Sequence, residues 1–345
     1  MSICFEGRLM NMSEFLQKNH DGIMKQKTGI PDTLGEISNE DIMPLIDRRM
    51  VLLTGAGDSY AVAQYGQWAL ANARCVAVAV SPPEIERYSL DKDCLVIGIT
   101  ASGRSVSTIN ALKHAQDEGA QTLILTDNPK SESIHIADFK WITKSGVDTF
   151  DIAPTAPTTA AMAYLLQTAA LMLALPNEGI CKDCRTLQKK MPKIIDWAVA
   201  EGKIIADFID VDNALYLISE GPNYVAAHIG MMKFNEFSLQ RTIVSLREEF
   251  QHHFNLSLQE GNRAVLVADS PTTESDEKYM SILNEPLEVP SYLLSAPESP
   301  NLLSSSAQAI ANTIALQVAA YQLALAHNPD MGWFKLPNAK AFRIY

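Results

Sequence analysis

Short apolar runs alternate with longer amphipathic stretches along this chain of 345 residues. Apolar runs cover residues 50–54, 94–99 and 122–126, each ends in a turn-forming segment, and a helical pattern follows over 106–118. Strands that alternate with helices of this length are typical of a parallel sheet covered on both faces. The pattern therefore predicts an α/β fold of the flavodoxin-like three-layer αβα type.

The second half of the chain repeats this order. Apolar runs return over residues 215–218, 264–269 and 292–295. The glycine turn after the first run also recurs, with Gly221 in the place of Gly57. We therefore expect two pseudo-repeated lobes, each built on a parallel sheet flanked by helices.

The boundary between the two lobes falls in residues 173–184, which carry proline, asparagine, glycine and a cysteine pair. Residues 185–210 then have the periodicity of an amphipathic helix. We expect four parts, namely an N-terminal helical segment (1–45), a first lobe (46–180), a second lobe (185–330) and a C-terminal tail (331–345) that reaches the active site.

Composition and charge exclude several classes of protein. Apolar residues make up 47% and charged residues 20%, which is ordinary for a globular chain. The formal net charge of -12 is spread along the chain without a run of Lys or Arg, so nucleic acid is not an expected partner. The longest apolar stretches, near 160–175 and 307–326, are interrupted by polar residues and predict buried helices rather than membrane spans.

The N-terminus and the cysteines favour a cytoplasmic protein. Residues 1–8 do not form a basic leader followed by an apolar core and a cleavage site. Five cysteines, an odd number, are not a disulfide framework. Cys181 and Cys184 are the one close pair and have no histidines nearby, so we expect reduced thiols and no metal site.

A candidate anion-binding loop follows the second apolar run. Thr100, Ser102 and Ser105 supply hydroxyl groups, and Gly103 allows a close turn before a helix begins. The exposed amides of a helix N-terminus bind anions, and ligands of open α/β sheets bind at the carboxyl ends of strands. A helix cap without a ligand fits the same residues, so the loop predicts a phosphate site with the cap as the alternative.

The glycine turn over residues 55–59 does not complete either of two nucleotide-binding motifs. Tyr60 stands where a dinucleotide fingerprint has its third glycine, and no Gly-Lys-Ser/Thr follows. We therefore expect no nicotinamide or nucleotide cofactor at this turn. A tight connection between a strand and a helix explains the segment equally well.

The loop at 100–105, the turn at 55–60 and the duplicated lobes together resemble the sugar isomerase (SIS) family. Within it, the resemblance is to the isomerase half of glutamine:fructose-6-phosphate amidotransferase and to stand-alone glucosamine-6-phosphate deaminases and fructosamine-6-phosphate deglycases. It implies a phosphosugar substrate and no cofactor. The residues that it implies for binding phosphate and sugar are Gly57, Asp58, Ser59, Thr100, Ala101, Ser102, Gly103, Ser105 and Ala153.

The family's proton-transfer residues have counterparts in the second lobe. Lys233 and Glu236 lie one turn apart on a helical pattern, where an exposed pair would be an ordinary ion pair. The resemblance implies that Glu236 moves a proton between C1 and C2 of the sugar and that Lys233 steadies the enolate oxygen. His252 matches the ring-opening histidine of the family, although its surroundings also fit an exposed loop histidine.

Two segments depart from the family pattern. Lys340 matches the tail lysine that forms an imine with the open-chain sugar, but it follows Asn338 by two residues rather than three. Residues 152–158 carry Ala153 and prolines where the family has Ser-Thr-Lys. These departures favour a relative that acts on another sugar or leaving group.

The resemblance thus implies an aldose–ketose isomerase or deaminase that acts on a hexosamine or hexose 6-phosphate, such as glucosamine 6-phosphate. No glutaminase domain precedes the first strand near Val51, so glutamine is not the expected ammonia source. A fructosamine-6-phosphate deglycase and a non-catalytic phosphosugar sensor are the alternatives. The resemblance also implies a homodimer in which His252 is shared across the interface.

Overall fold

The computed structural model describes residues 2–5, 8–11, 13–148, 153–173, 179–332 and 341–344. They fall into two compact units. One unit contains the first lobe and comprises residues 25–191 with the described tail residues 341–344. The other contains the second lobe and comprises the described residues up to 24 with 192–332.

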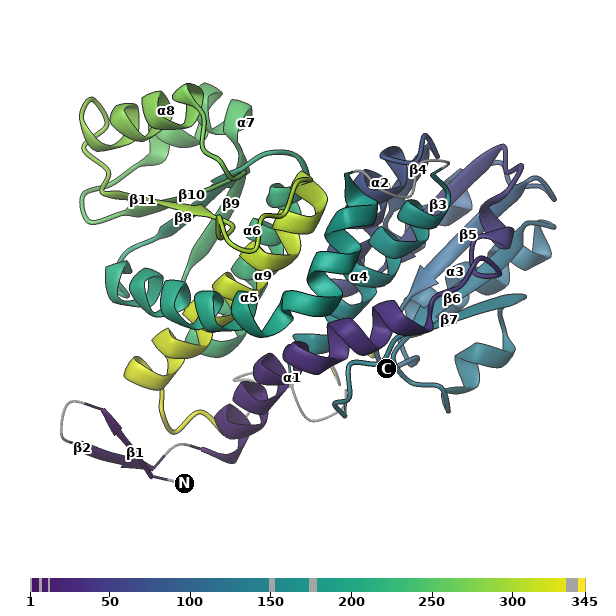
Figure 1. Cartoon of the computed structure of the whole chain (residues 1–345), viewed down its shortest axis with the longest axis horizontal. Coiled ribbons are helices and arrows are strands. Elements are labelled where there is room, and N and C mark those ends of the chain that lie inside the picture. Colours follow the sequence, from purple (N-terminus) through teal and green to yellow (C-terminus); the bar gives the residue numbers. More distant parts are fainter. Residues whose placement is uncertain are drawn as a thin grey trace. The chain divides into compact units, whose positions relative to one another are not determined.

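The first lobe is built on a parallel sheet with the strand order β4-β3-β5-β6-β7 (Figure 1). Its strands are β3 (Met50–Gly55), β4 (Ala77–Val80), β5 (Cys94–Ile99), β6 (Gln121–Thr126) and β7 (Phe139–Ile142). The sequence pattern predicts β3, β5 and β6, whose residues are almost entirely buried. It misses β4 and β7, which are edge strands of four residues each; β4 is apolar throughout but short, and Lys140 interrupts β7.

Helices cover both faces of this sheet. On one face, α3 (Val106–Asp117) packs through Leu112 against Leu52 of β3. On the other face lie α2 (Asp58–Ala71) and α4 (Ala156–Leu171). They approach closely at Gly66 of α2, where an added Cβ would lie 2.8 Å from Leu53 and 3.1 Å from Leu165. The three-layer αβα prediction is confirmed.

The second lobe has a parallel sheet with the order β11-β10-β8-β9. Its strands are β8 (Leu215–Ser219), β9 (Thr242–Leu246), β10 (Arg263–Ala268) and β11 (Ser291–Ser295). Strands β9, β8, β10 and β11 follow the same order as β4, β3, β5 and β6 of the first lobe. The sheets therefore confirm the predicted duplication, although β9 escaped the sequence pattern and β7 has no counterpart in the described part of the second sheet.

Helices also cover both faces of the second sheet. On one face, α7 (Arg247–His252) and α8 (Glu274–Asn284) pack through Phe250 and Leu283. On the other face lie α6 (Gly221–Lys233) and α9 (Ser305–His327). α9 is long and apolar enough to cross a membrane by length and composition alone, but 89% of its most apolar window is buried inside the structure. This burial agrees with the predicted core helix.

The remaining elements precede or connect the sheets. Helix α1 (Glu14–Glu36) and helix α5 (Ile180–Phe208) each contribute residues to both units. A hairpin of β1 (Ser2–Phe5) and β2 (Arg8–Asn11) precedes α1 and was not predicted. Short helical turns are η1 (Met43–Leu45), η2 (Pro82–Arg87), η3 (Glu132–His135), η4 (Phe234–Ser238) and η5 (Phe254–Ser257), of which η4 is a π-helix and the others are 3₁₀ helices.

Gly103 provides a test of the packing beneath the predicted anion loop. It has a φ of +71°, and an added Cβ would lie 2.3 Å from the Cβ of Ser131. Gly119 is a matched control, because its φ is +86° but no atom lies within 4 Å of an added Cβ. We expect Gly119→Ala to cost about 1–2 kcal/mol for the backbone conformation alone, and Gly103→Ala to cost about 1–3 kcal/mol more through overpacking. Urea unfolding of both variants measures the difference, and equal losses would contradict the close packing at Gly103.

Candidate active site

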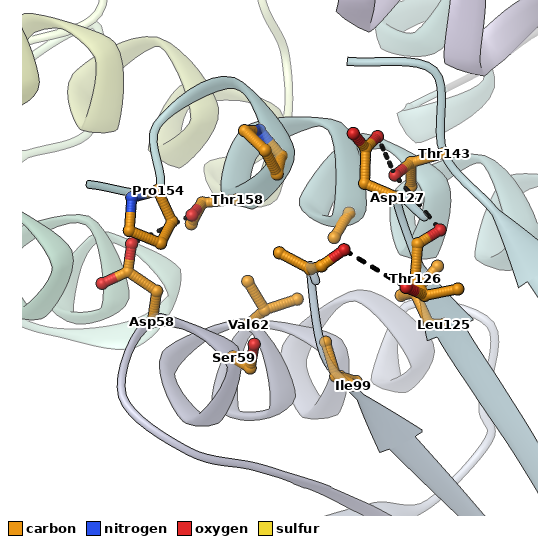
Figure 2. Close-up of a pocket in the computed structure, with 13 residues that line it drawn as sticks. Asp58, Ser59, Val62, Ile99, Leu125, Thr126, Asp127, Thr143, Pro154 and Thr158 are labelled. Atoms are coloured by element: carbon orange, nitrogen blue, oxygen red, sulfur yellow. Dashed lines mark hydrogen bonds between the residues drawn. The ribbon is translucent and has the colours of Figure 1, made fainter. Parts of the chain in front are cut away.

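A pocket lies at the carboxyl edge of the first sheet (Figure 2). Its lining residues come from the ends of β5, β6 and β7 and from α2 and α4 with the segment before it. They are Asp58, Ser59, Val62, Ile99, Ala101, Leu125, Thr126, Asp127, Thr143, Pro154, Pro157, Thr158 and Ala161. The structure thus brings together three of the predicted binding residues, namely Asp58, Ser59 and Ala101. The enclosed space is about 20 Å³, so only a small group of a ligand fits it without movement of the walls.

Asp58 and Thr158 form one side of the pocket (Figure 2). Asp58 is in the first turn of α2, and its Oδ2 accepts a hydrogen bond of 3.0 Å from the Thr158 hydroxyl on α4. Gly57, just before α2, has a φ of +58°, which a residue with a Cβ rarely adopts. The turn therefore places Asp58 and Ser59 next to each other at the carboxyl edge of the first sheet.

Asp127, directly after β6, forms the opposite side and was not singled out in the sequence. Its Oδ1 accepts hydrogen bonds from the Thr143 hydroxyl (2.6 Å) and the Ser145 amide (2.9 Å), and its Oδ2 accepts one from the Ser145 hydroxyl (2.5 Å). Burial raises the pKa of Asp127 even though these three donors favour the charged form. An acidic residue that immediately follows a buried strand is the sequence signal for this group.

The predicted phosphate loop turns between β5 and α3. Gly103 lies buried at the centre of the turn, and its amide donates to the Thr100 carbonyl at 3.2 Å. Ser102 is half-buried, and its hydroxyl accepts from the Arg104 amide at 3.3 Å. The buried Ser105 hydroxyl accepts from Thr108 at 3.0 Å. Ser102 is therefore the more accessible of the two serine hydroxyls.

The described end of the C-terminal tail lies against this loop. The first amide of α3, at Val106, donates to the Ile344 carbonyl at 3.2 Å. An acceptor thus already occupies a helix N-terminal amide, which is the kind of group that binds anions. Lys340, the predicted imine-forming residue, lies outside the described residues.

The other six predicted binding residues, namely Gly57, Thr100, Ser102, Gly103, Ser105 and Ala153, do not line the pocket. Two of them, Thr100 and Ala153, lie beneath the loops. Thr100 is buried, and its amide donates to the Leu125 carbonyl at 3.0 Å, which extends the pairing of β5 with β6. Ala153 is fully buried just before α4. Both therefore shape the loops from beneath in this structure.

Lys233 and Glu236 form a close ion pair in the second lobe. Lys233 ends α6 and is fully buried, and its Nζ lies 2.6 Å from Oε2 of Glu236. Glu236 sits on the π-helical turn η4, and its side chain is 29% exposed. Widened turns of this kind often occur at functional sites. The geometry holds one carboxylate oxygen against a buried ammonium while part of the group stays accessible.

His252 is the last residue of α7 and lies at the surface of the second lobe. Its Nε2 is 3.0 Å from Oε1 of Glu248 one turn earlier, and the two side chains are 69% and 72% exposed. Pairs this exposed contribute little to stability. The imidazole is therefore accessible to solvent within its own lobe.

The second lobe does not repeat the anion loop of the first. The segment after β10 has Asp269, Ser270 and Pro271 where the first lobe has Ala101, Ser102 and Gly103. Asp269 accepts from Asn223 at 2.7 Å, and the Ser270 amide donates to Gln308 at 2.6 Å. A carboxylate and an occupied amide disfavour an anion at this place.

Metal ligands do not cluster in the described part of the chain. No group of three or more His, Cys, Asp or Glu side chains gathers there in an arrangement that could hold an ion. Cys181 and Cys184 are buried free thiols at the start of α5. Burial raises the pKa of Cys184 well above its ordinary value, which favours the protonated thiol at neutral pH.

The raised pKa of Asp127 predicts a pH-dependent effect of Asp127→Asn. A carboxyl group with a raised folded-state pKa binds its proton more tightly in the folded chain, so its ionisation costs stability as the pH rises above the ordinary value of 3.8. We expect the variant to gain stability relative to the parent between about pH 4 and about pH 7. Urea unfolding at both pH values measures this gain, and a constant difference would show that Asp127 ionises like an exposed aspartate.

The amino-acid sequence is similar to a known domain family and to curated proteins. Residues 44–175 match the SIS domain family. The isomerizing glutamine–fructose-6-phosphate aminotransferase of Pyrococcus horikoshii is 25% identical over 306 residues, which is 81% of this chain and 50% of that protein. The corresponding protein of Aquifex aeolicus is 29% identical over 276 residues, which is 77% of this chain and 45% of that protein. The chain thus spans about half the length of the curated relatives it matches.

Solved structures share the fold of both lobes. The C-terminal domain of glucosamine-fructose-6-phosphate aminotransferase from Francisella tularensis aligns with a TM-score of 0.78 at 17% identity, over 92% of this chain and 98% of that one. Glucosamine-6-phosphate deaminase of Thermotoga maritima aligns with a TM-score of 0.71 at 15% identity, over 91% and 97%. Residues 44–175 therefore match the SIS domain family, and the chain is similar in sequence to the isomerizing glutamine–fructose-6-phosphate aminotransferases.

Proposed function

We propose that the chain is a phosphosugar isomerase or deaminase that acts on a hexosamine or hexose 6-phosphate. The observation that carries this proposal is the Lys233–Glu236 pair, in which a fully buried ammonium lies 2.6 Å from a partly exposed carboxylate. A buried charge is costly unless it is paired. The lysine therefore holds the carboxylate in one orientation, as a base that shuttles a proton between neighbouring carbons requires.

Each step of the proposed reaction uses a named group of this chain. His252 opens the sugar ring, and Glu236 moves a proton from C2 to C1 of the open aldose, which leaves an imine at C2. Lys233 stabilises the charge that develops on oxygen. Lys340 attacks the imine and releases ammonia, and water then frees the ketose. The net change converts glucosamine 6-phosphate and water into fructose 6-phosphate and ammonia.

The anion loop of the first lobe supplies substrate binding in this proposal. Ser102 is accessible at the turn, and the N-terminus of α3 follows it. Hydroxyl groups and a helix N-terminus suit a phosphate dianion, which would displace the Ile344 carbonyl from the Val106 amide. Asp58 and Asp127 on the pocket walls suit sugar hydroxyl or amino groups, because ionised carboxylates accept hydrogen bonds.

We also propose a cytoplasmic homodimer in which each subunit supplies His252 to the site of the other. The exposure of the His252 side chain supports this arrangement, since a second copy of the chain can reach it. The relatives' names support a phosphosugar substrate, and nothing in the chemistry proposed here requires nucleic acid, a membrane or a cofactor.

Replacement of Glu236 by Gln tests the proton shuttle. We expect the parent chain to release ammonia from glucosamine 6-phosphate and Glu236→Gln to lose about 10²–10⁴-fold in kcat. Binding of the sugar phosphate, measured by calorimetry, should change little. Glu260→Gln on an exposed loop is the matched control. An active Glu236→Gln variant excludes the proposed base, whereas binding without turnover in the parent supports a sensor.

Replacement of Lys340 by Ala distinguishes the two enzymatic alternatives. If Lys340 forms the imine, the variant loses ammonia release from glucosamine 6-phosphate while binding is retained. A deglycase that does not use the tail lysine keeps its activity on fructosamine 6-phosphates. Assays of released ammonia and free amine on both substrate types, with parent and variant side by side, decide between them.

A further inference from the structure

Helix α7 presents His252 at its C-terminal end and is too short to hold its own position. It has six residues, and isolated helices below about 12 residues are marginal in water. Tertiary contacts must therefore fix its place. These contacts converge on Arg247, the first residue of the helix.

Arg247 and Asp276 form a buried ion pair that ties α7 to α8. Nη2 of Arg247 lies 2.5 Å from Oδ1 of Asp276, and the two residues are 8% and 5% exposed. Oδ2 of Asp276 accepts from the amide (2.8 Å) and the hydroxyl (2.7 Å) of Thr273. Burial disfavours the charge, but the donors of Thr273 and Arg247 outweigh it and keep the pKa of Asp276 below its ordinary value. The pair is thus charged at neutral pH.

Aromatic rings complete the buried side of α7. The guanidinium carbon of Arg247 lies 5.3 Å from the ring centre of Tyr279, whose hydroxyl donates to the Arg247 carbonyl at 3.3 Å. Phe250 is buried between Tyr216 and Tyr279, with ring centres 5.8 and 6.4 Å away. His252 lies on the exposed side of the same helix.

Stability alone does not explain a charged pair at this place. Apolar residues of similar size often stabilise a protein as well as a buried ion pair does. Nε of Arg247 is buried without a hydrogen-bond partner, which adds a cost. The second acidic neighbour, Glu220, is largely exposed and lies 3.7 Å from Nη1, so it contributes little. What the pair does supply is a fixed orientation of α7.

We propose that Arg247, held by Asp276, is a positioning residue that orients His252 for opening of the sugar ring. This inference rests on the proposed function. Arg247 itself lies under the helix and acts through the backbone of α7. The exact placement of His252 matters, because a displacement of about 1 Å can cost about 10²-fold in rate.

Arg247→Lys tests this role, because lysine keeps the charge but loses the planar fork and the ring contact. The readout is exchange of the C1 proton with deuterium from solvent, measured by NMR on two ketose phosphates. Fructose 6-phosphate must open its ring, whereas 5-deoxyfructose 6-phosphate has no O5 and stays open. We expect the variant to exchange about 10–100-fold more slowly than the parent on the first substrate and within about twofold on the second.

Two further variants serve as a positive and a negative control. His252→Ala should give the same selective loss, and Arg263→Lys at the start of β10, on the amino edge of the same sheet, should give none. Equal losses of Arg247→Lys on both substrates, or no loss on fructose 6-phosphate, would overturn the inference. A parent inactive on both substrates would instead refute the proposed function. In that case, faster amide exchange confined to α7 in Arg247→Lys supports the anchoring role, and unchanged exchange refutes it.

Discussion

Parallel strands end at one common edge, and this constraint assembles the site of the first lobe. The residues at the ends of β3, β5, β6 and β7 are separated by long stretches of sequence, yet the sheet order places them side by side. No single segment contains the pocket. Its walls are then fixed by hydrogen bonds from Thr158 to Asp58 and from Thr143 and Ser145 to Asp127. The fold thus determines the position of the chemistry, and the loops determine its kind.

Charge burial plays the corresponding part in the second lobe. Lys233 and Arg247 are both buried, and each forms an ion pair with a carboxylate close to it. The two pairs differ in solvent exposure, since the side chain of Glu236 is partly exposed whereas that of Asp276 is buried. One pair can therefore meet a ligand, and the other can only hold the structure around it. For this reason we propose a role in the reaction for the Lys233–Glu236 pair and a positioning role for the Arg247–Asp276 pair.

Much of this arrangement could be predicted from the sequence because the central strands carry continuous apolar runs. The runs at 50–54, 94–99 and 215–218 gave the correct elements and the duplication. Short edge strands such as β7 escaped, since four residues interrupted by Lys140 do not differ from a loop in their pattern. The Lys233–Glu236 pair followed from helical spacing, but the π-helical turn that exposes Glu236 has no clear signature. Asp127 and Arg247 were missed as functional candidates because their roles depend on partners distant in sequence.

The loop after β10 shows how a duplicated fold loses its symmetry. One carboxylate, Asp269, stands where the first lobe has Ala101, and the neighbouring amide of Ser270 already donates to the Gln308 side chain. The two sheets present equivalent strand edges, but only the first is followed by a loop rich in hydroxyl groups. If the first lobe binds the phosphosugar as proposed, the chain has one binding site rather than two, despite its two similar sheets.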